Sequence, residues 1–235
     1  MASVRILGPG RAGTSFALAL AAVGWDVVES WGRGDDPRAA TTGVDIVLLT
    51  TPDAAVAEVA AAIAPDPDVV VAHTAGSLGL DVLADHERRA SVHPLLPLPG
   101  GELGATRLRS GGWFAVAGDP LVGEVVSALG GRAFEVAEDD RVRYHAAAVV
   151  ASNHLVALLG QVERMAAAID VPFEAYLDLV RATVDNVAEL GPRLALTGPA
   201  ARGDAHTIAR HLDAIDPAER PGYEALVAEA RRLAR

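Results

Sequence analysis

Short apolar runs alternate with helical patterns over residues 1–137 of the chain. Several of these runs are continuously apolar, which is typical of strands whose two faces are both covered. We expect strands at Val4–Leu7, Val27–Ser30, Val44–Thr50, Val69–Ala72, Ala90–His93, Trp113–Ala117 and Arg132–Val136. Helical patterns lie between them at Ala12–Val23, Ala54–Ile63, Leu80–Glu87 and Leu121–Leu129. Strands and helices that alternate at this spacing predict an α/β fold with a doubly wound (Rossmann) parallel sheet.

The pattern changes after residue 137, where the strand-like runs stop. Long helical patterns rich in Ala, Leu and Val follow at Asp139–Ala168, Pro172–Glu189, Asp204–Asp213 and Pro217–Leu233. We therefore expect two domains, an α/β domain over residues 1–137 and a smaller all-helical domain over residues 138–235. The Pro- and Gly-rich stretch His93–Gly112 is expected to form a long loop, and long loops inside compact domains often carry function.

The longest uncharged run of the chain is Ala146–Val162. It approaches the length of a membrane-spanning helix, but it contains polar or flexible residues at Ser152, Asn153, His154, Gly160 and Gln161. We interpret it as a helix buried between protein layers, with no contact to a membrane. One small domain cannot easily bury so apolar a helix, so we expect a homodimer formed through the helical domain.

Composition narrows the class of protein. Aromatic residues make up 4% of the 235 residues, so the core is expected to consist of small aliphatic side chains. The net charge of −11 argues against non-specific binding to nucleic acid. Without cysteine the chain has neither disulfides nor thiolate chemistry, and no His, Asp and Glu spacing suggests a metal site. The N-terminus lacks the pattern of a signal peptide, so a cytoplasmic location is expected.

The motif GPGRAG follows the first expected strand and begins the first expected helix. In this setting the first glycine permits a tight turn, the second lets the backbone approach a pyrophosphate, and the third lets helix and strand pack closely. The helix N-terminus offers free N–H groups to the phosphates. The motif therefore predicts a dinucleotide-binding loop formed by Gly8, Pro9, Gly10, Arg11, Ala12 and Gly13. A glycine turn that binds nothing is the alternative.

The end of the second strand, VVESWGRG, bears on which dinucleotide is bound. Glu29 could accept a hydrogen bond from the adenosine ribose, which would favour NAD, but it stands before the expected end of the strand. Arg33 follows that end, where its guanidinium could bind a 2′-phosphate. We therefore expect NADP rather than NAD. A surface ion pair of Arg33 with Asp35 or Asp36 is the alternative.

Further polar residues follow the third, fourth and fifth strands. The carboxyl ends of parallel strands share one edge of the sheet, where ligands of doubly wound folds bind. At this edge we expect cofactor contacts from Thr50, Thr51, Pro52 and Thr74, and substrate contacts from His73 and Ser77. His93 closes the fifth strand and emerges at the same edge. Its side chain could donate a proton, because an ordinary histidine pKa lies near neutral pH, or it could simply cap the strand.

Six segments together resemble a known family. They are GPGRAG, TTPD, HTAGSL, SVHPL, the helix YHAAAVVASNHLVALL (Tyr144–Leu159) and LTGPAARGD (Leu196–Asp204). Over essentially the whole chain they look like a family of Rossmann-like oxidoreductases of undetermined function. The helical C-terminal domain of that family is similar to the one in 6-phosphogluconate dehydrogenase. Relatives include ketopantoate reductase, pyrroline-5-carboxylate reductase and prephenate dehydrogenase. The resemblance implies a reductase that uses a nicotinamide cofactor.

The catalytic residues implied by the resemblance match only in part. The β-hydroxyacid dehydrogenase branch carries a catalytic lysine one helical turn before an asparagine. Asn153 matches the asparagine, but Val149 stands in the place of the lysine, and the chain contains no lysine at all. His93 resembles the His-Pro of prephenate dehydrogenases that binds a substrate hydroxyl. The candidate catalytic residues are therefore His93, Asn153 and Ser152.

Two more residues of the helical domain are candidates for substrate binding. His145 and Ser152 are seven residues apart and should share a helical face, although His145 could also be a packed interface residue. Arg202 in the LTGPAARGD segment could hold an anionic substrate, or it could lie in a plain loop before a helix capped by Asp204.

Two functions stay open at this point. One is an NADP-dependent reductase that transfers hydride to a small 2-oxo acid or imine, of the ketopantoate reductase-like class. The other is a non-catalytic dinucleotide-binding sensor or scaffold that has lost the catalytic lysine. The missing lysine favours the second function, whereas His93 and Asn153 favour the first.

Overall fold

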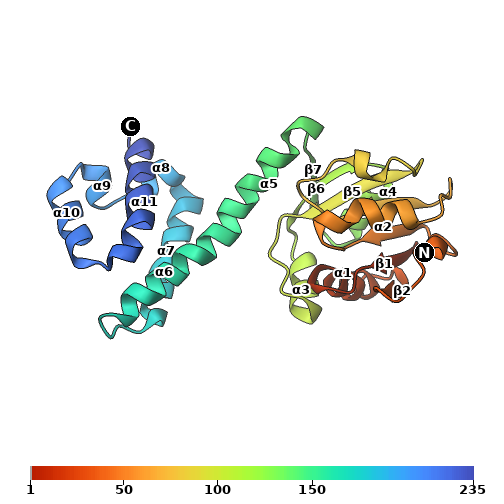
Figure 1. The fold of residues 1–235 in the computed structure, drawn as a ribbon, viewed down its shortest axis with the longest axis horizontal. Coiled ribbons are helices and arrows are strands. Elements are labelled where there is room, and N and C mark those ends of the chain that lie inside the picture. The colour runs from red at the N-terminus through yellow and green to blue at the C-terminus, as the bar shows by residue number, and fades with distance from the viewer. Residues whose placement is uncertain (1) are drawn as a thin grey trace. The chain divides into compact units, whose positions relative to one another are not determined.

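The computed structural model describes residues 2–235, and the chain divides into two compact units, Met1–Ser152 and Asn153–Arg235. Figure 1 shows the first unit as a sheet with helices around it and the second as a group of helices. The sequence pattern separates the domains at residue 137. In the structure the first unit continues beyond that point, because it includes helix α5 (Arg141–Val149).

Seven strands form one sheet in the order β2-β1-β3-β4-β5-β6-β7. They are β1 (Ser3–Leu7), β2 (Asp26–Trp31), β3 (Ile46–Leu49), β4 (Val70–His73), β5 (Arg89–Pro94), β6 (Trp113–Gly118) and β7 (Arg132–Glu135). Each corresponds to an expected strand. The chain builds outward from β1 first to β2 and then, on the other side, to β3, so the winding direction reverses between β1 and β3. This reversal is the arrangement that defines a doubly wound Rossmann-like sheet.

The sheet is mostly rather than wholly parallel. Strand β6 pairs antiparallel with β5, so that Ala90 lies opposite Gly118 and Pro94 opposite Phe114. Strand β7 is parallel to β6. The expected doubly wound parallel sheet is confirmed, and β6 and β7 run opposite to the other strands, because the connection after β5 returns the chain to the same edge at which β5 ends.

Two hydrophobic clusters cover the two faces of the sheet. Strand residues alternate between the faces, so Val4 and Ile6 join one cluster while Leu7 joins the other. The first cluster contains apolar residues of α1 (Arg11–Ala22), α3 (Gly101–Leu108) and α4 (Leu121–Ala128). The second contains Val56 and Ala60 of α2 (Val56–Ala62). Most of these side chains are Ala, Val, Leu or Ile, as the composition predicts.

Two expectations about the connections are wrong. The stretch expected as a long loop contains helix α3, which packs against α1: Ala105 and Leu108 are buried, and Gly104 lies directly on Ser15. Conversely, the helix expected over Leu80–Glu87 is only a 3₁₀ turn at Leu80–Leu83. Further 3₁₀ turns lie at Pro37–Ala39, Asp53–Ala55, Glu138–Asp140 and Pro217–Glu219.

The second unit is helical, as expected. Its helices are α6 (Leu155–Ala167), α7 (Phe173–Leu190), α8 (Pro192–Ala195), α9 (Pro199–Arg202), α10 (Ala205–Ala214) and α11 (Arg220–Leu233). Arg164 of α6 forms an ion pair with Glu219 at 2.5 Å, which ties α6 to the start of α11. Between α5 and α6 the helix continues as one π-helical turn, Val150–His154.

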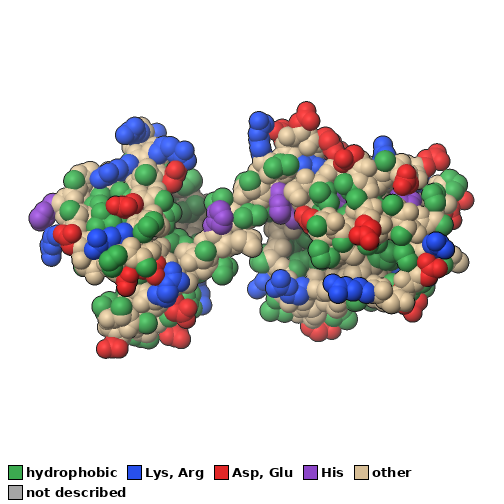
Figure 2. All heavy atoms as spheres, in the orientation of Figure 1, with side chains coloured by type: hydrophobic (Ala, Val, Ile, Leu, Met, Phe, Trp, Pro, Cys, Tyr) green, Lys and Arg blue, Asp and Glu red, His purple; other side chains and the backbone are tan. Residues whose placement is uncertain are grey.

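The helical unit has little apolar core of its own. Of its described residues, only Ala166 and Ile208 are buried hydrophobic residues. Large apolar side chains are exposed on α7, including Leu179 and Val184. Figure 2 shows hydrophobic side chains among the charged ones over the visible face of these helices.

The continuous helix Glu138–Ala167 is long and apolar enough to span a membrane by length and composition alone, and none of its most apolar window is buried within the chain. No residue of the uncharged run Ala146–Val162 is buried. The single chain therefore does not bury this run, and its burial between protein layers stays an expectation that needs a second chain. Its apolar side chains are free to contact something else.

Candidate functional site

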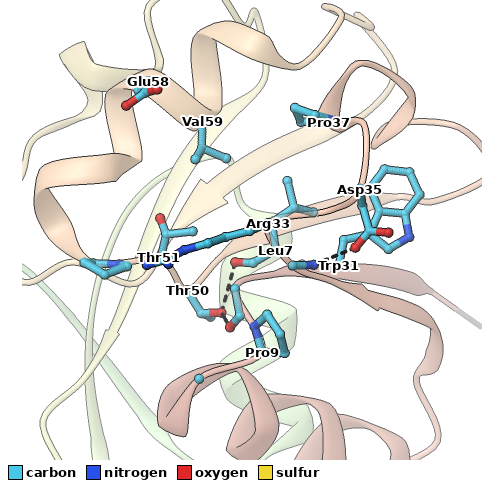
Figure 3. Close-up of a pocket in the computed structure, with 14 residues that line it drawn as sticks. Leu7, Pro9, Trp31, Arg33, Asp35, Pro37, Thr50, Thr51, Glu58 and Val59 are labelled. Carbon is cyan, nitrogen blue, oxygen red and sulfur yellow. Dashed lines mark hydrogen bonds between the residues drawn. The ribbon is translucent and has the colours of Figure 1, made fainter.

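A cleft of about 720 Å³ opens at the carboxyl end of β1 and β3, where the winding direction reverses. It lies at the place where doubly wound folds bind ligands. The residues that line it are Leu7, Gly8, Pro9, Gly10, Trp31, Gly32, Arg33, Asp35, Pro37, Thr50, Thr51, Pro52, Glu58 and Val59 (Figure 3). Seven of the eleven expected cofactor contacts are in this set.

The glycine loop has the geometry that its three roles require. Gly8 has a φ of +104°, a value that only glycine adopts readily. A Cβ at Gly13 would clash with the carbonyl oxygen of Gly8 and lie 2.7 Å from Oγ1 of Thr50. A Cβ at Gly10 would meet no atom within 4 Å, because this glycine faces open space. The loop is thus tightly packed at Gly8 and Gly13 and open at Gly10.

Helix α1 begins directly after this loop. Gly10 is its N-cap residue and provides no side-chain cap for the first N–H groups, and the first turn contains no acidic residue. The N–H groups of a first helical turn have no partner within the helix and carry a partial positive charge. This end of α1 is therefore suited to phosphate groups.

The end of β3 supports the loop from the other side. Oγ1 of Thr50 lies 3.1 Å from the carbonyl oxygen of Leu7 and 2.7 Å from that of Gly8, and both bonds are drawn in Figure 3. Thr50 thus connects β3 to the glycine loop. Oγ1 of Thr51 is buried and has no hydrogen-bond partner. A buried hydroxyl at the wall of a cleft, without a partner, is suited to a polar group of a ligand.

Trp31 at the end of β2 forms an aromatic part of the wall. Its indole Nε1 donates a hydrogen bond to Glu29 at 2.7 Å, and the guanidinium of Arg5 lies 4.4 Å from the ring centre. Arg5 is buried, and its Nη1 donates to the carbonyl oxygens of Ala40 at 2.5 Å and Thr42 at 2.9 Å. The Trp31 ring is therefore held at two points. Glu29 does not line the cleft, and its carboxylate is occupied by Trp31.

Arg33 extends into the cleft from the turn after β2 (Figure 3). The alternative of an ion pair with a neighbouring aspartate is not observed within the described residues. Asp35 instead accepts a hydrogen bond from the Gly32 N–H at 2.7 Å, and Asp36 accepts one from the Arg38 N–H at 3.1 Å. The exposed guanidinium of Arg33 is thus available to a ligand.

The other expected cofactor residues do not line the cleft. Gly13 is buried behind Gly8, and Arg11 and Ala12 lie in the first turn of α1. Oγ1 of Thr74 donates to the carbonyl oxygen of Leu49 at 3.3 Å, which places it beside β3.

A second group of polar side chains lies on β5 and α5. Ser91 and His93 are two residues apart on β5 and so share one face. Arg141, Tyr144 and His145 are three and four residues apart on α5, which places them together on one helical face. The two sets meet: Nη2 of Arg141 donates to Oγ of Ser91 at 2.6 Å, and Nδ1 of His93 lies 2.6 Å from the hydroxyl of Tyr144.

The imidazole of His93 is surrounded on several sides. The rings of Tyr144 and His145 approach it edge to face, with centroids 5.5 Å and 5.8 Å away. Gly76 lies against the far edge of the ring, where a Cβ would come within 2.9 Å of Nε2. Strand β5 is two strands from β3, a separation of about 10 Å. Because His93 lies near the carboxyl end of β5, it stands at the same edge of the sheet as the cleft.

The environment changes the ionisation of this pair. Burial, with a smaller contribution from His145, lowers the pKa of His93 to about 4. Burial also raises the pKa of Tyr144 to about 12. At neutral pH His93 is therefore an uncharged imidazole and Tyr144 an uncharged phenol. The expectation of a histidine pKa near neutral pH is wrong, because the ring is largely removed from water.

Two of the expected substrate contacts from the strand ends have partners within the protein. His73 is fully buried, and its Nε2 lies 3.0 Å from the carbonyl oxygen of Gly79, so it cannot reach a ligand without a rearrangement. Burial lowers its pKa. Oγ of Ser77 donates to the carboxylate of Asp53 at 3.1 Å.

The candidates on the later helices lie in separate places. Ser152 is the last residue of the first unit and Asn153 the first of the second, and both stand in the π-helical turn. A π-helical turn contains more residues than an α-helical one, so the expectation that His145 and Ser152 share a helical face does not follow in this helix. Arg202 is exposed at the end of α9, and Asp204 caps α10 by accepting from the Thr207 N–H at 2.9 Å.

Several residues of these sites are absent from the sequence-based candidates. Trp31, Asp35 and Val59 line the cleft, and Arg141 and Tyr144 contact the β5 residues. The spacing of Arg141, Tyr144 and His145 on an expected helix could have indicated the second group. Over residues 2–235 no cluster of three or more His, Asp or Glu side chains could hold a metal ion.

Comparison with protein families gives one match. Residues 115–230 match the family described as Domain of unknown function (DUF2520). No curated protein matches the chain.

Solved structures match over nearly the whole chain. BF3122 from Bacteroides fragilis, a provisionally named NADP oxidoreductase, is 22% identical, with a TM-score of 0.85 and coverage of 98% of both chains. A reductive aminase from Aspergillus terreus, in complex with NADPH4, cyclohexanone and allyl amine, is 14% identical, with a TM-score of 0.72, covering 99% of this chain and 94% of that one. Plasmodium falciparum pyrroline carboxylate reductase with NADP bound is 11% identical, with a TM-score of 0.65, covering 100% and 98%. The likeness shows that the chain has the two-part fold of these proteins, a Rossmann-like sheet followed by helices.

Proposed function

We propose that this protein is an NADP-dependent reductase that transfers hydride to a small carbonyl or imine compound, of the 2-oxo acid or cyclic imine class. The observation that carries the proposal is the free guanidinium of Arg33 in a cleft whose opposite wall is a glycine loop and a helix N-terminus. Such a cleft offers one site for a pyrophosphate and another for a 2′-phosphate.

Several features of the cleft support the binding of a dinucleotide. The open space at Gly10 leaves room for the backbone to approach a pyrophosphate, and Oγ1 of Thr51 lacks a partner within the protein. Gly8, Gly10 and the first turn of α1 would hold the phosphates, and Trp31 would form a wall of the adenosine site. Bound there, NADPH would supply hydride.

The choice of NADP over NAD depends on the charges near the end of β2. The NAD-type contact needs a carboxylate in the cleft for the ribose hydroxyls, whereas Glu29 does not line the cleft and its Oε2 accepts the indole N–H of Trp31. Asp35 does line the cleft, but its carboxylate is engaged by the Gly32 N–H. Arg33 is then the group best suited to the additional phosphate of NADP.

The names of the similar structures support the same class. Two of them contain NADP or a reduced form of it, and the third carries the name of an NADP oxidoreductase. One is a pyrroline carboxylate reductase and one a reductive aminase, and both names refer to compounds that contain a carbon–nitrogen bond. These names make imines a natural part of any substrate screen for this protein.

His93 is the residue we propose as the proton donor. Reduction of a carbonyl or imine needs a proton at the oxygen or nitrogen, and neither lysine nor cysteine is present in the sequence. Ser152 and Asn153 are proposed to orient the substrate through their hydroxyl and amide groups. His145 is proposed to line the site beside His93, and Arg202 to bind an anionic substrate group.

We further propose a cytoplasmic homodimer. The helical unit exposes apolar side chains on α7, and the uncharged run Ala146–Val162 is unburied. A second copy of the chain is better suited than lipid to bury these apolar side chains, because polar side chains such as Ser152, Asn153 and Gln161 interrupt the run.

A non-catalytic dinucleotide sensor is the second candidate function. The observation that favours it is Val149 in the place of a catalytic lysine. A screen of 2-oxo acids and cyclic imines, followed by loss of NADPH absorbance, separates the two functions. Turnover of any member supports the reductase, and NADPH binding without turnover across the screen supports the sensor.

A further inference from the structure

Tyr144 is engaged with the imidazole of His93 at one atom only. Its hydroxyl lies 2.6 Å from Nδ1, which is a short hydrogen bond, and the two rings are close to perpendicular, at 88°. No other hydrogen bond of this hydroxyl is present among the described residues. Tyr144 is half-buried, and Phe134 of β7 packs on its ring at 5.8 Å. The phenol is therefore fixed against Nδ1.

The direction of this bond follows from the groups available. A phenol has one O–H to donate, and a neutral imidazole has one N–H and one acceptor nitrogen. If Nδ1 donated to the hydroxyl, both the phenol O–H and Nε2 would lack a partner among the described residues, which costs free energy at a half-buried site. If the hydroxyl donates to Nδ1, only the Nε2–H lacks a partner among the described residues, and the imidazole proton resides on Nε2.

We propose that Tyr144 is a positioning residue that donates its hydrogen bond to Nδ1 of His93 and so fixes the imidazole as the Nε2–H tautomer. This inference rests on the proposed function for its use in catalysis. A neutral His93 then presents an N–H donor rather than a lone pair at its Nε2 edge, where Gly76 lies close to the ring and has no side chain of its own.

Tyr144 replaces the proton that His93 gives to the substrate. As the substrate carbon receives hydride from the nicotinamide, the bond between His93 Nε2 and its proton breaks and a new O–H or N–H bond forms on the substrate. In the same step the Tyr144 O–H proton moves to Nδ1, so the imidazole remains neutral and a phenolate is left. Afterwards Nε2 takes a proton from solvent and Nδ1 returns its proton to Tyr144.

Arg141 is placed to stabilise that phenolate. Its side chain is 1% exposed and carries its charge into the protein beside Ser91. Nε and Nη1 have no hydrogen-bond partner, and the nearest carboxylate, that of Glu138, is 4.0 Å from Nε. A buried cation with so little compensation favours a new negative charge nearby. Its charge also acts to lower the pKa of Tyr144.

The charges that face His93 agree with a neutral donor. His145, Arg141 and His73 each disfavour a protonated imidazole, and only Asp53 favours it. Burial also disfavours the protonated imidazole. An imidazolium at His93 would be scarce at neutral pH, so a donor that works there needs the neutral N–H form.

The test is the tautomer of His93, read by NMR of protein labelled with ¹⁵N at histidine. We expect the signals of a protonated Nε2 and an unprotonated Nδ1 in the wild type, and loss of this pattern in Tyr144→Phe. Tyr223→Phe is the matched control, because the Tyr223 hydroxyl lies 2.6 Å from Nδ1 of His211 in the helical unit. That variant should change the His211 signals and leave those of His93 unchanged. A protonated Nδ1 on His93 in the wild type would overturn the proposal.

A kinetic readout separates positioning from mere packing. Once a substrate is found, Tyr144→Phe should lower kcat by about 10-fold or more with NADPH affinity unchanged. Its remaining rate should rise toward acid pH, since only the imidazolium can then supply the proton, whereas the wild-type rate should be flat there. A variant rate and pH profile equal to the wild type would refute the positioning role. The NMR result does not depend on turnover, so a failed substrate screen would count against the proposed function alone.

Discussion

Glu29, the last acidic residue of β2, accepts a hydrogen bond from the indole Nε1 of Trp31 at 2.7 Å and does not line the cleft. The same contact holds the Trp31 ring in the wall of the cleft, with Arg5 against the ring. The residue left to meet the ribose end of a dinucleotide is Arg33. The proposed preference for NADP thus depends on an interaction between two residues of one strand, Glu29 and Trp31.

Replacement of Arg33 by Ala should weaken NADPH binding and leave NADH binding nearly unchanged. The variant loses a charge-assisted contact to the 2′-phosphate, which is worth about 1.5–3 kcal/mol, or roughly 10- to 100-fold in affinity. Fluorescence titration of both cofactors measures the difference. Arg38→Ala is the matched control, because Arg38 is exposed in the same loop region but does not line the cleft. A similar loss for both cofactors in Arg33→Ala would contradict the assignment.

Two glycine variants should separate folding from binding. Gly13→Ala places a methyl group against the Gly8 carbonyl and Thr50, so it should lower the free energy of unfolding by about 1–3 kcal/mol. Gly10→Ala has free space and an ordinary negative φ, so the fold should be nearly unaffected while NADPH binding weakens. Thermal unfolding and cofactor titration give the two quantities. Unchanged NADPH affinity in Gly10→Ala would show that the loop does not hold the pyrophosphate.

His93→Gln should lower turnover by about 100-fold or more without changing NADPH affinity, because it removes the proton donor and keeps the shape of the side chain. Steady-state kinetics with an identified substrate and a cofactor titration check both parts. Near wild-type turnover in this variant would show that water or His145, and not His93, donates the proton.

The stability of the protein should depend on His93 in acid. Its pKa is lowered to about 4 in the folded state, while the unfolded value is about 6.5. Between these values the unfolded chain binds a proton that the folded protein does not, so the free energy of unfolding decreases as pH falls from about 6.5 to 4. The slope from this residue is at most about 1.4 kcal/mol per pH unit.

Denaturant unfolding at a series of pH values measures this slope. His93→Gln should reduce it but not remove it, because burial also lowers the pKa of His73. Identical slopes for the variant and the wild type would show that His93 is hydrated in solution.

Leu179→Glu should convert a homodimer into a monomer. Leu179 is 63% exposed on α7 of the helical unit, and a carboxylate there would be buried if a second copy covered this face. Light scattering over a dilution series gives the mass. Leu103→Glu is the control, because Leu103 is similarly exposed, at 57%, but lies on α3 of the first unit. A wild type that is monomeric at all concentrations would rule out the dimer.

The sequence predicted the sheet well because its strands are short, apolar and separated by helical patterns. It failed where tertiary packing decides the local structure. Helix α3 begins at two glycines of positive φ, Gly100 and Gly101, which read as loop residues, yet contact with α1 makes the segment helical. The π-helical turn at Val150–His154 likewise has no signature in the local pattern.

The site was predictable to a similar degree. The glycine loop, Arg33 and the Thr50–Pro52 segment follow from motif and strand order, and all contribute to the cleft. The burial of His73 and the lowered pKa of His93 could not be predicted, because both depend on how α5 and the segment after β4 cover the strand ends. Tyr144 could have been suspected from its spacing to Arg141 on the same helix.

The cleft between the glycine loop and Arg33 should prefer NADP to NAD, and this preference can be measured. Its most direct test is titration of the wild-type protein with NADPH and with NADH under identical conditions, followed by fluorescence or calorimetry. We expect saturable binding of both, with NADPH bound about 10-fold or more tightly than NADH, as expected for one charge-assisted phosphate contact. Equal affinities for the two cofactors, or binding of neither, would contradict it.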